Sequence, residues 1–391
     1  MRLSCNCRNA ALALLLAFMP AALAAEQLTL WCNRGVAALQ QSAARYSART
    51  GVEVVIENPV NALVNFEIKA AAGGGPDILC WGHDRIGDWA AAGLLSAVAS
   101  EAELKDLGLL PWTLPAVQVD GRFYGYPLFV EALGLIINPK LVAVPPVDLL
   151  ELPQWASTLP AGVTAFAWPW LDPYFSWPLL SGGDGYLFAR NARGDWLRQQ
   201  PGINQPQVVR QLGWWQQQMV TGVIPKPMEA GRIRSRFARG QIAMMVEGPW
   251  SWRDLDRLGV PWQLVPWPTL GRQPVRPLVG VHVAMINAFS PRQDLAQDFL
   301  RHHLLQPQEL LAWAASGELG AMAQHQAAAD QRCDPRLALL LANAEQGRVM
   351  PNIAAMGRFW AVMATSLDNV ANGRQSPAEA LADTEARLLL L

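Results

Sequence analysis

The sequence lacks the features that mark membrane proteins, disulfide scaffolds and nucleic-acid-binding proteins. Its longest apolar run, residues 10–22, is too short to span a bilayer, which needs about 20 apolar residues. Only 5 of 391 residues are cysteine, and 31 Lys and Arg are balanced by 32 Asp and Glu without a basic cluster. We therefore expect no membrane insertion, no disulfide scaffold and no nucleic acid partner.

The first 24 residues have the pattern of a secretory signal peptide. Two arginines precede the apolar run, and the small-residue site at 22–24 follows it. A lipid anchor would need a cysteine directly after the run, whereas Cys5 and Cys7 precede it. We therefore expect a soluble protein exported to the periplasm. Without the leader, 29 Lys and Arg remain against 32 Asp and Glu, a net charge of −3, which favours a neutral partner.

The cysteines after the leader are Cys32, Cys80 and Cys333, so at most one bridge forms within the chain. Cys32 and Cys80 each lie near the end of a predicted strand. They can pair if these strands are neighbours, and buried free thiols are the alternative.

Strand and helix patterns alternate after the leader, which predicts an α/β protein with mainly parallel sheets covered by helices. The chain is long enough for two domains. We expect strands at 27–32, 52–57, 77–81, 133–138, 163–166, 242–247 and 278–286, and helices at 36–50, 66–72, 84–92, 208–219 and 293–304. Asp120-Gly121 predicts the two-residue turn of a hairpin.

Motifs of phosphate binding, hydrolysis and metal binding are missing. The glycines at 73–75 precede a strand and no Gly-Lys-Ser/Thr follows, so a turn is the interpretation. No Ser-His-Asp signature occurs, and the adjacent His302 and His303 point to different helix faces. We therefore expect no metal, no cofactor and no enzymatic activity.

The stretch D-P-Y-F-S-W-P at 172–178 begins a predicted helix with an unusual density of rings. Asp172 is a good N-cap and a proline suits the next position. Tyr174 and Trp177 share a helix face, but Phe175 lies about 100° round from Tyr174. One core cannot easily receive all three rings, so we expect at least one to face a cleft. A cap followed by core aromatics is the alternative.

Polar residues also follow or interrupt the apolar strands. Trp81, Asp84 and Arg85 follow a strand directly, where open α/β sheets bind ligands. An N-cap with a neighbouring salt bridge is the alternative for the last two. Glu131 is the single charge in the apolar run P-L-F-V-E-A-L. A buried carboxylate is costly unless it is paired, hydrogen-bonded or facing a cavity, so Glu131 is the stronger candidate.

Tryptophan is the commonest aromatic residue, 17 against 11 Phe and 5 Tyr. Trp250 follows a predicted strand in E-G-P-W-S-W, and Trp360 ends M-P-N-I-A-A-M-G-R-F-W. A single Trp is more often in a core. However, covering ~40 Å² of a sugar's C–H face contributes on the order of 1 kcal/mol. Hydrogen bonds from charged groups add roughly 1.5–3 kcal/mol each. Rings, carboxylates and arginine together favour a neutral polyol.

Seven segments resemble, in order, the periplasmic maltose/maltodextrin-binding proteins, which are the substrate-binding components of ABC sugar importers. They are G-P-D-I-L-C-W-G-H-D-R, Y-P-L-F-V-E-A-L, D-P-Y-F-S-W-P-L, G-P-W-S-W, G-V-H-V-A-M-I-N-A-F-S-P, M-P-N-I-A-A-M-G-R-F-W and N-G-R-Q-S-P-A-E-A-L. The resemblance implies a periplasmic binding protein fold with two α/β lobes, a ligand cleft between them, and a hinge near 130–131, 281–283 and 330.

The resemblance also implies a lobe division and a function. The signal peptide would occupy 1–24, one lobe 25–130 plus 284–330, and the other 131–283 plus 331–391. The protein is then expected to be a monomer that delivers maltose, maltodextrin or a related glucoside to the membrane subunits of an ABC transporter. Two alternatives stay open: a sugar sensor for a membrane receptor, and a glycoside hydrolase that uses Asp84, Glu131 and Asp172.

Carried over by position, the resemblance implies ligand contacts from both lobes. They are Trp81, Asp84, Arg85, Glu131, Asp172, Tyr174, Phe175, Trp250 and Trp360, while Trp177 is expected to pack inward.

Several positions depart from the family. Asp172 replaces a Glu, the loop at Arg34-Gly35 is shorter and lacks an Asp-Lys pair, and Ala230, Ala364 and Asn61 stand where the family has Tyr, Arg and Lys. Arg34 is expected either to replace the lost Lys or, by preference, to be a solvated loop residue.

Overall fold

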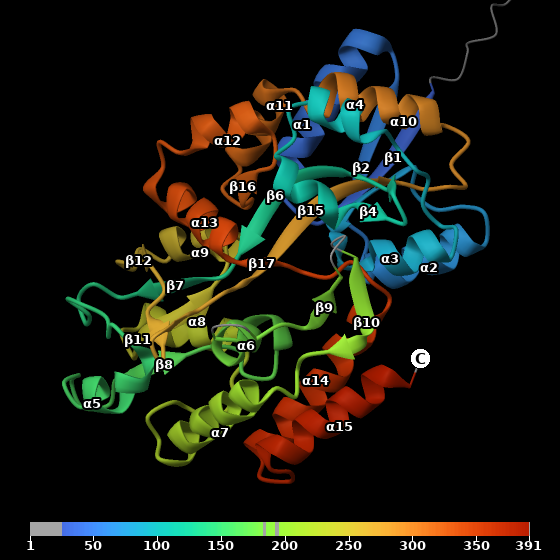
Figure 1. Ribbon diagram of the computed structural model, residues 1–391. Helices are drawn as coiled ribbons and strands as arrows, with labels where there is room; N and C mark the ends of the chain where they lie inside the picture. Colours follow the sequence, from blue (N-terminus) through green and yellow to red (C-terminus); the bar gives the residue numbers. More distant parts are fainter. Residues whose placement is uncertain (1–25, 183–184, 192–194, 391) are drawn as a thin grey trace, which may run out of the picture.

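The structure is a computed structural model that describes residues 26–182, 185–191 and 195–390. Two main β-sheets, each covered by helices, lie one above the other in Figure 1. The predicted α/β class is therefore confirmed. The predicted signal peptide lies outside the described residues. No helix in the described part of the chain is long and apolar enough to cross a membrane.

The larger sheet has the strand order β16-β6-β15-β3-β1-β2, and β17 pairs with β15. Its strands are β1 (Gln27–Cys32), β2 (Glu53–Glu57), β3 (Ile78–Gly82), β6 (Tyr126–Ala132), β15 (Leu278–Ile286), β16 (Ala321–Met322) and β17 (Arg348–Val349). β1 runs parallel to β2 and β3, but β15 runs antiparallel to β3 and β6. The sheet is mixed, so the prediction of mainly parallel sheets is wrong.

The helices that belong to this part are shown around the larger sheet in Figure 1. They are α1 (Val36–Thr50), α2 (Ala62–Ala71), α3 (Ile86–Ala91), α4 (Glu101–Asp106), α10 (Gln293–Phe299), α11 (Pro307–Ala314), α12 (His325–Gln331) and α13 (Pro335–Gln346). Their ends follow local chemistry: α4 begins with a capping box between Ser100 and Glu103. α2 begins four residues earlier than expected, at Ala62.

The smaller sheet has the order β12-β7-β11-β8 and is also mixed. Its strands are β7 (Gly134–Ile137), β8 (Thr164–Ala167), β11 (Ile242–Glu247) and β12 (Gln263–Val265). The helices of this part are α5 (Leu152–Ala156), α6 (Pro173–Leu180), α7 (Pro206–Val220), α8 (Ala230–Ala238), α9 (Trp252–Arg257), α14 (Ala355–Ala371) and α15 (Pro377–Leu389).

Three small hairpins complete the described fold: β4 (Gln118–Val119) with β5 (Arg122–Phe123), β9 (Phe188–Arg190) with β10 (Trp196–Pro201), and β13 (Thr269–Leu270) with β14 (Gln273–Pro274). Asp120 and Gly121 both have positive φ, 48° and 76°, which confirms the predicted turn between β4 and β5.

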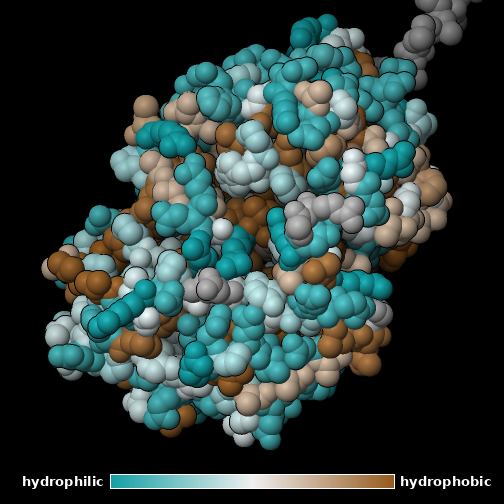
Figure 2. Space-filling model, in the orientation of Figure 1, coloured by the Kyte–Doolittle hydropathy of each residue, from teal (hydrophilic) through white to brown (hydrophobic). Residues whose placement is uncertain are grey.

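The chain passes between the two parts of the molecule more than once. β6 lies in the larger sheet and the next strand, β7, in the smaller one; β15 returns to the larger sheet, and α14 follows β17 back to the smaller part. β15 pairs with β3 and β6 over residues 279–286. The molecular surface in Figure 2 is hollowed between the two parts, and hydrophobic residues gather there. The lobe boundaries themselves stay a prediction.

Cys32 and Cys80 lie opposite each other on β1 and β3, so the predicted strands are neighbours. Both residues are buried free thiols rather than a disulfide. This is the alternative interpretation given above.

We predict that Gly320→Ala destabilises the fold by about 1–3 kcal/mol. Gly320 is buried beside β16, and a Cβ atom there would lie 1.8 Å from the backbone carbonyl oxygen of Val130 in β6. The clash involves backbone, so a side-chain rotation cannot relieve it. Urea unfolding measures the effect.

Gly213→Ala is the matched control for this substitution. Gly213 lies in the middle of α7, and its added Cβ would meet Pro377 Cγ at an ordinary 3.7 Å. Alanine has a better helix propensity than glycine, so this variant should be more stable by roughly 0.5–1 kcal/mol. Equal stability of the two variants would contradict the packing described for Gly320.

Candidate functional site

A cavity of about 810 Å³ lies between the two parts of the molecule. Its volume is in the usual range of small-molecule sites. Its lining comes from the short helical turn after β3, the loop before α6, the first turn of α6, the start of α8 with the residues before it, the residue after β17, and α14. The lining residues are Asp84, Pro169, Leu171, Asp172, Pro173, Tyr174, Phe175, Pro227, Met228, Glu229, Ala230, Arg232, Met350 and Trp360.

The first turn of α6 presents two rings to this cavity. The carboxylate of Asp172 accepts a hydrogen bond of 2.9 Å from the backbone N–H of Tyr174, which caps the helix as expected. Tyr174 and Phe175 then line the cavity, whereas Trp177 is only 1% exposed and packs edge-to-face on Phe359 at 6.2 Å. The prediction that the three rings separate between a cleft and the interior is therefore confirmed.

Helix α14 contributes the opposite ring and a direct link between the two parts. The indole Nε1–H of Trp360 donates a hydrogen bond of 3.1 Å to Asp84, which follows β3 of the larger sheet. The ring of Tyr174 lies 6.4 Å from Trp360 and 6.2 Å from Trp250, measured between centroids. These rings form one aromatic cluster, and Asp84 supplies a carboxylate beside it.

Arg34 joins the larger sheet to this aromatic cluster. Its guanidinium makes an ion pair of 3.2 Å with Glu131 and lies 5.7 Å from the ring centroid of Trp250. The short loop is held in place because the backbone carbonyl of Arg34 accepts a hydrogen bond from Trp313 Nε1. Gly35 then turns the chain into α1 with φ 52°, where a Cβ would come within 2.6 Å of Trp313. The interpretation of Arg34 as a solvated loop residue is wrong.

Burial changes the ionisation of the acidic groups near the cavity. It raises the pKa of Glu131, and the positive charge of Arg34 opposes this shift. The pKa of Asp172 is also raised, chiefly by desolvation, although backbone N–H groups at the helix start act against it. Desolvation, followed by the carboxylates of Glu131 and Asp172, raises the pKa of the Tyr174 hydroxyl. Tyr174 therefore stays a neutral hydrogen-bond donor and acceptor at neutral pH.

The structure brings together most, but not all, of the predicted site residues. Asp84, Asp172, Tyr174, Phe175 and Trp360 line the cavity.

The other four predicted residues are outside the lining. Trp250 contacts the rings of the cluster, and Glu131 is linked through Arg34. Trp81 lies on β3 with its ring 6.5 Å from His282, and Arg85 pairs with Glu67 at 2.6 Å.

Sequence reasoning missed several lining residues. Met228, Glu229 and Arg232 stand at the start of α8, and Met350 follows β17. They sit at element boundaries without a distinctive motif. In the segment before and within α8, the sequence analysis named Ala230 alone, because the family has a tyrosine there. Ala230 does line the cavity.

A family model described as bacterial extracellular solute-binding protein matches residues 33–315. The chain belongs to this family. The description of this family places its members outside the cytoplasm. The two-lobed binding-protein fold expected from the sequence is confirmed by this match and by the two sheets.

Three relatives illustrate the similarity. The maltotriose-binding protein of Pyrococcus abyssi is 25% identical over 329 residues, covering 82% of this chain and 71% of the relative. The maltodextrin-binding protein MdxE of Bacillus subtilis is 24% identical over 339 residues, covering 83% and 79%. The galactooligosaccharide-binding protein of Bacillus subtilis is 24% identical over 371 residues, covering 91% and 87%. These relatives are binding proteins by name, and the predicted resemblance to maltodextrin-binding proteins is confirmed.

We predict a pH-dependent gain in stability for Glu131→Gln. The pKa of Glu131 is raised above its ordinary 4.5 by burial. As the pH rises through the unfolded pKa and then the raised folded pKa, the carboxylate ionises and its burial costs stability, whereas well below the unfolded pKa it is protonated in both states and this cost is absent. The free energy of unfolding of the variant relative to wild type should therefore rise between roughly pH 4 and pH 7.

Urea unfolding at both pH values measures this difference. Glu101→Gln is the matched control, because Glu101 lies on the surface of α4, 54% exposed, in an ion pair with Lys105. Because this carboxylate is not buried, comparing the two variants separates the effect of burial from the loss of a negative charge. A Glu131→Gln variant that loses relative stability as the pH rises would contradict the burial argument.

Proposed function

We propose that the cavity binds a gluco-oligosaccharide of the maltose or maltodextrin type, or a related glucoside. The observation that carries this proposal is the combination of rings and carboxylates in one space. Tyr174 and Trp360 offer flat faces to sugar C–H surfaces, while Asp84 and Asp172 offer oxygen acceptors to hydroxyl groups. The described lining contains three acids and one arginine, a balance that disfavours an anionic ligand.

The relatives support this ligand class, since those quoted above are named for maltotriose, maltodextrin and galacto-oligosaccharides. The positions at which this chain departs from the family pattern indicate a changed subsite rather than a different class of ligand. Ala230 leaves room in the cavity where the resemblance implies a tyrosine ring, and Arg34 supplies a cation near the lost Lys. The preferred sugar and its chain length therefore have to be determined by titration.

The protein is proposed to act in the periplasm as a monomer that presents its sugar to the membrane subunits of an ABC transporter. A ligand that contacts both parts stabilises the conformation in which they approach. The hinge is proposed to lie where the chain passes between the sheets, including the links from β6 to β7 and from β17 to α14. The approach of the two parts would then signal the loaded state to the transporter.

Titration calorimetry with maltose, maltotriose, trehalose and sucrose tests the ligand class. We expect at least one sugar to bind with a dissociation constant near the micromolar range, about −8 kcal/mol. Trp360→Ala should weaken that binding roughly tenfold or more, because it removes a stacking face and the donor to Asp84. Heat from none of the four sugars would contradict the proposal.

Trp262→Ala is the matched control for loss of an indole. Trp262 packs on Trp252 and donates to Asp256, away from the cavity lining. Its sugar affinity should equal that of wild type. The oligosaccharide recovered after the titration should be intact; release of glucose would instead favour the glycoside hydrolase alternative.

Small-angle X-ray scattering tests the proposed closure. Saturating sugar should reduce the radius of gyration of the wild type, because the ligand favours the conformation in which both parts contact it. The Trp360→Ala variant at the same sugar concentration should show a smaller reduction. An unchanged radius of gyration in wild type with calorimetrically proven binding would overturn closure while leaving sugar binding intact.

A further inference from the structure

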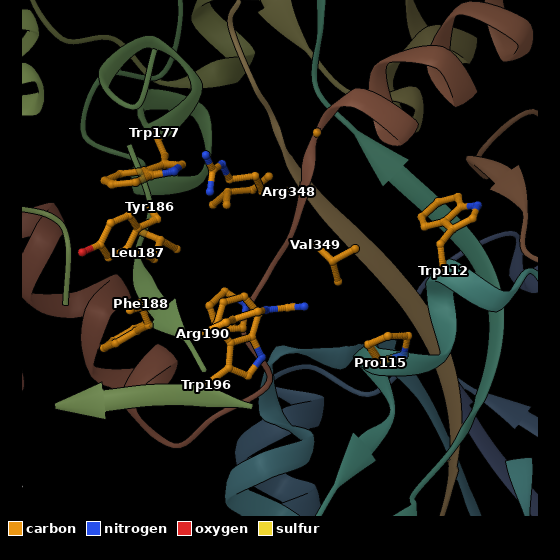
Figure 3. Close-up of a pocket in the computed structure, with 14 residues that line it drawn as sticks. Trp112, Pro115, Trp177, Tyr186, Leu187, Phe188, Arg190, Trp196, Arg348 and Val349 are labelled. Carbon is orange, nitrogen blue, oxygen red and sulfur yellow. The ribbon is translucent and has the colours of Figure 1, made fainter. Parts of the chain in front are cut away.

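A short stretch of the chain contributes residues to two different cavities. We call residues 348–352, which are β17 and the three residues after it, the connecting segment. Met350 lines the sugar cavity, whereas its neighbour Val349 lines a second cavity of about 570 Å³ that shares no described lining residue with the first. Figure 3 shows Val349 between Trp112 of the larger part and Trp196 of the β9–β10 hairpin. The conformation of the connecting segment therefore affects the lining of the sugar cavity.

Backbone hydrogen bonds attach the connecting segment to the larger sheet. β17 pairs with Leu278 and Val279 of β15. The N–H of Met350 then donates a hydrogen bond of 3.1 Å to the carbonyl oxygen of Val279. The side chain of Met350 nevertheless packs in the hydrophobic cluster that forms the core of the smaller part. Met350 is therefore held by one part through its backbone and contacts the other part through its side chain.

The imidazole of His83 adds a side-chain link between the connecting segment and the larger sheet. Its Nε2 lies 2.8 Å from the carbonyl oxygen of Met350, and its Nδ1 lies 3.0 Å from the backbone nitrogen of Val281 in β15. Because a carbonyl oxygen can only accept, Nε2 carries the proton and Nδ1 accepts from the N–H of Val281. His83 is fully buried, and burial lowers its pKa, which keeps the ring neutral at pH 7.

The side chain of Asn352 fixes the other end of the connecting segment. Asn352 is buried, and its Nδ2 donates hydrogen bonds of 3.0 Å and 2.9 Å to the carbonyl oxygens of Ala116 and Gln118. Helix α3 packs closely on the same residue, since a Cβ atom at Gly87 would lie 2.1 Å from the carbonyl oxygen of Asn352. The carbonyl group of Met350 thus lies between two attached stretches, β17 and Asn352, and its partner is His83.

His83 also directly precedes a residue that lines the sugar cavity. The helical turn after β3 begins at His83, and the next residue, Asp84, lines the cavity and accepts the hydrogen bond from Trp360. Because the His83 ring bonds the carbonyl oxygen of Met350, this turn and the connecting segment are held in one arrangement. Two lining residues from distant parts of the sequence, Asp84 and Met350, are thereby placed relative to each other.

We propose that His83 is a positioning residue of the sugar cavity, whose imidazole holds Asp84 and Met350 in the arrangement that the ligand meets. This proposal rests on the proposed sugar function. His83 is not among the described lining residues, so it acts through its two neighbours. A lining that is ordered before binding spares the ligand the cost of ordering it, and His83 therefore increases affinity without contacting the sugar.

Two substitutions separate the two hydrogen bonds of the His83 ring. His83→Asn keeps an oxygen near the position of Nδ1, where it accepts from Val281, but this side chain is too short to reach Met350. His83→Gln places an amide N–H near the position of Nε2, where it donates to Met350. In titration calorimetry with maltose and maltotriose, we expect His83→Asn to bind roughly fivefold more weakly than wild type. His83→Gln should recover most of this loss.

His302→Asn is the matched control for loss of an imidazole, because His302 is an exposed histidine. It should bind both sugars like wild type, and thermal unfolding shows that each variant is folded. Wild-type affinity in His83→Asn, or equal weakening in His83→Asn and His83→Gln, would overturn the proposal.

Nuclear magnetic resonance tests the positioning of Met350 without any sugar. With isotope-labelled methionine methyl groups, the Met350 signal, assigned through Met350→Leu, should shift in His83→Asn and return towards its wild-type position in His83→Gln. The signal of Met322, which lies in β16, should not change. In the wild type, ring nitrogen spectra at pH 7 should show a neutral His83 imidazole with its proton on Nε2.

These spectra distinguish failure of the positioning role from failure of the sugar function. An unmoved Met350 signal in His83→Asn, or a wild-type ring with its proton on Nδ1, would overturn the role of His83 whether or not a sugar binds. The expected spectra support that role. If they occurred without heat from any sugar, the sugar function alone would be contradicted.

Discussion

Helix α6 and the segment after β17 separate two cavities whose described lining residues are different. Tyr174 and Phe175 of α6 line one cavity and Trp177 lines the other, although Tyr174 and Trp177 are three positions apart on one helix face, so the helix period alone does not explain the division. In the segment after β17, Met350 lines the first cavity and its neighbour Pro351 lines the second. No described residue lines both cavities, so each cavity has its own hydrogen-bonding groups and rings.

A buried carboxylate next to the aromatic cluster is compensated by an arginine. Glu131 is the one charged residue of β6, and burial alone would favour its neutral form. Arg34 compensates it across the sheet and at the same time lies over Trp250. The short loop after β1 thus adds a cation beside the aromatic cluster. Arg34 therefore links the buried carboxylate of Glu131 to the ring of Trp250, beside the rings that line the cavity.

Much of the fold and part of the site could be predicted because the signals are local. Asp172 caps α6 through the N–H of a residue two positions on, and Asp120-Gly121 forms its turn within the same two residues. Both effects depend on neighbours in the chain. The antiparallel pairing of β15 with β3 and β6 was not predicted, because it joins strands about 150 to 200 residues apart.

The α/β elements, the helix caps and the motifs of an extracellular solute-binding protein could be predicted from short stretches of sequence with characteristic spacing. The folded arrangement was needed to show that Arg34 pairs with Glu131, that Arg85 pairs with Glu67 outside the cavity lining, and that a second cavity has a separate set of lining residues. Those features depend on which distant segments meet, and that is set by packing of the two sheets and their helices rather than by local propensity.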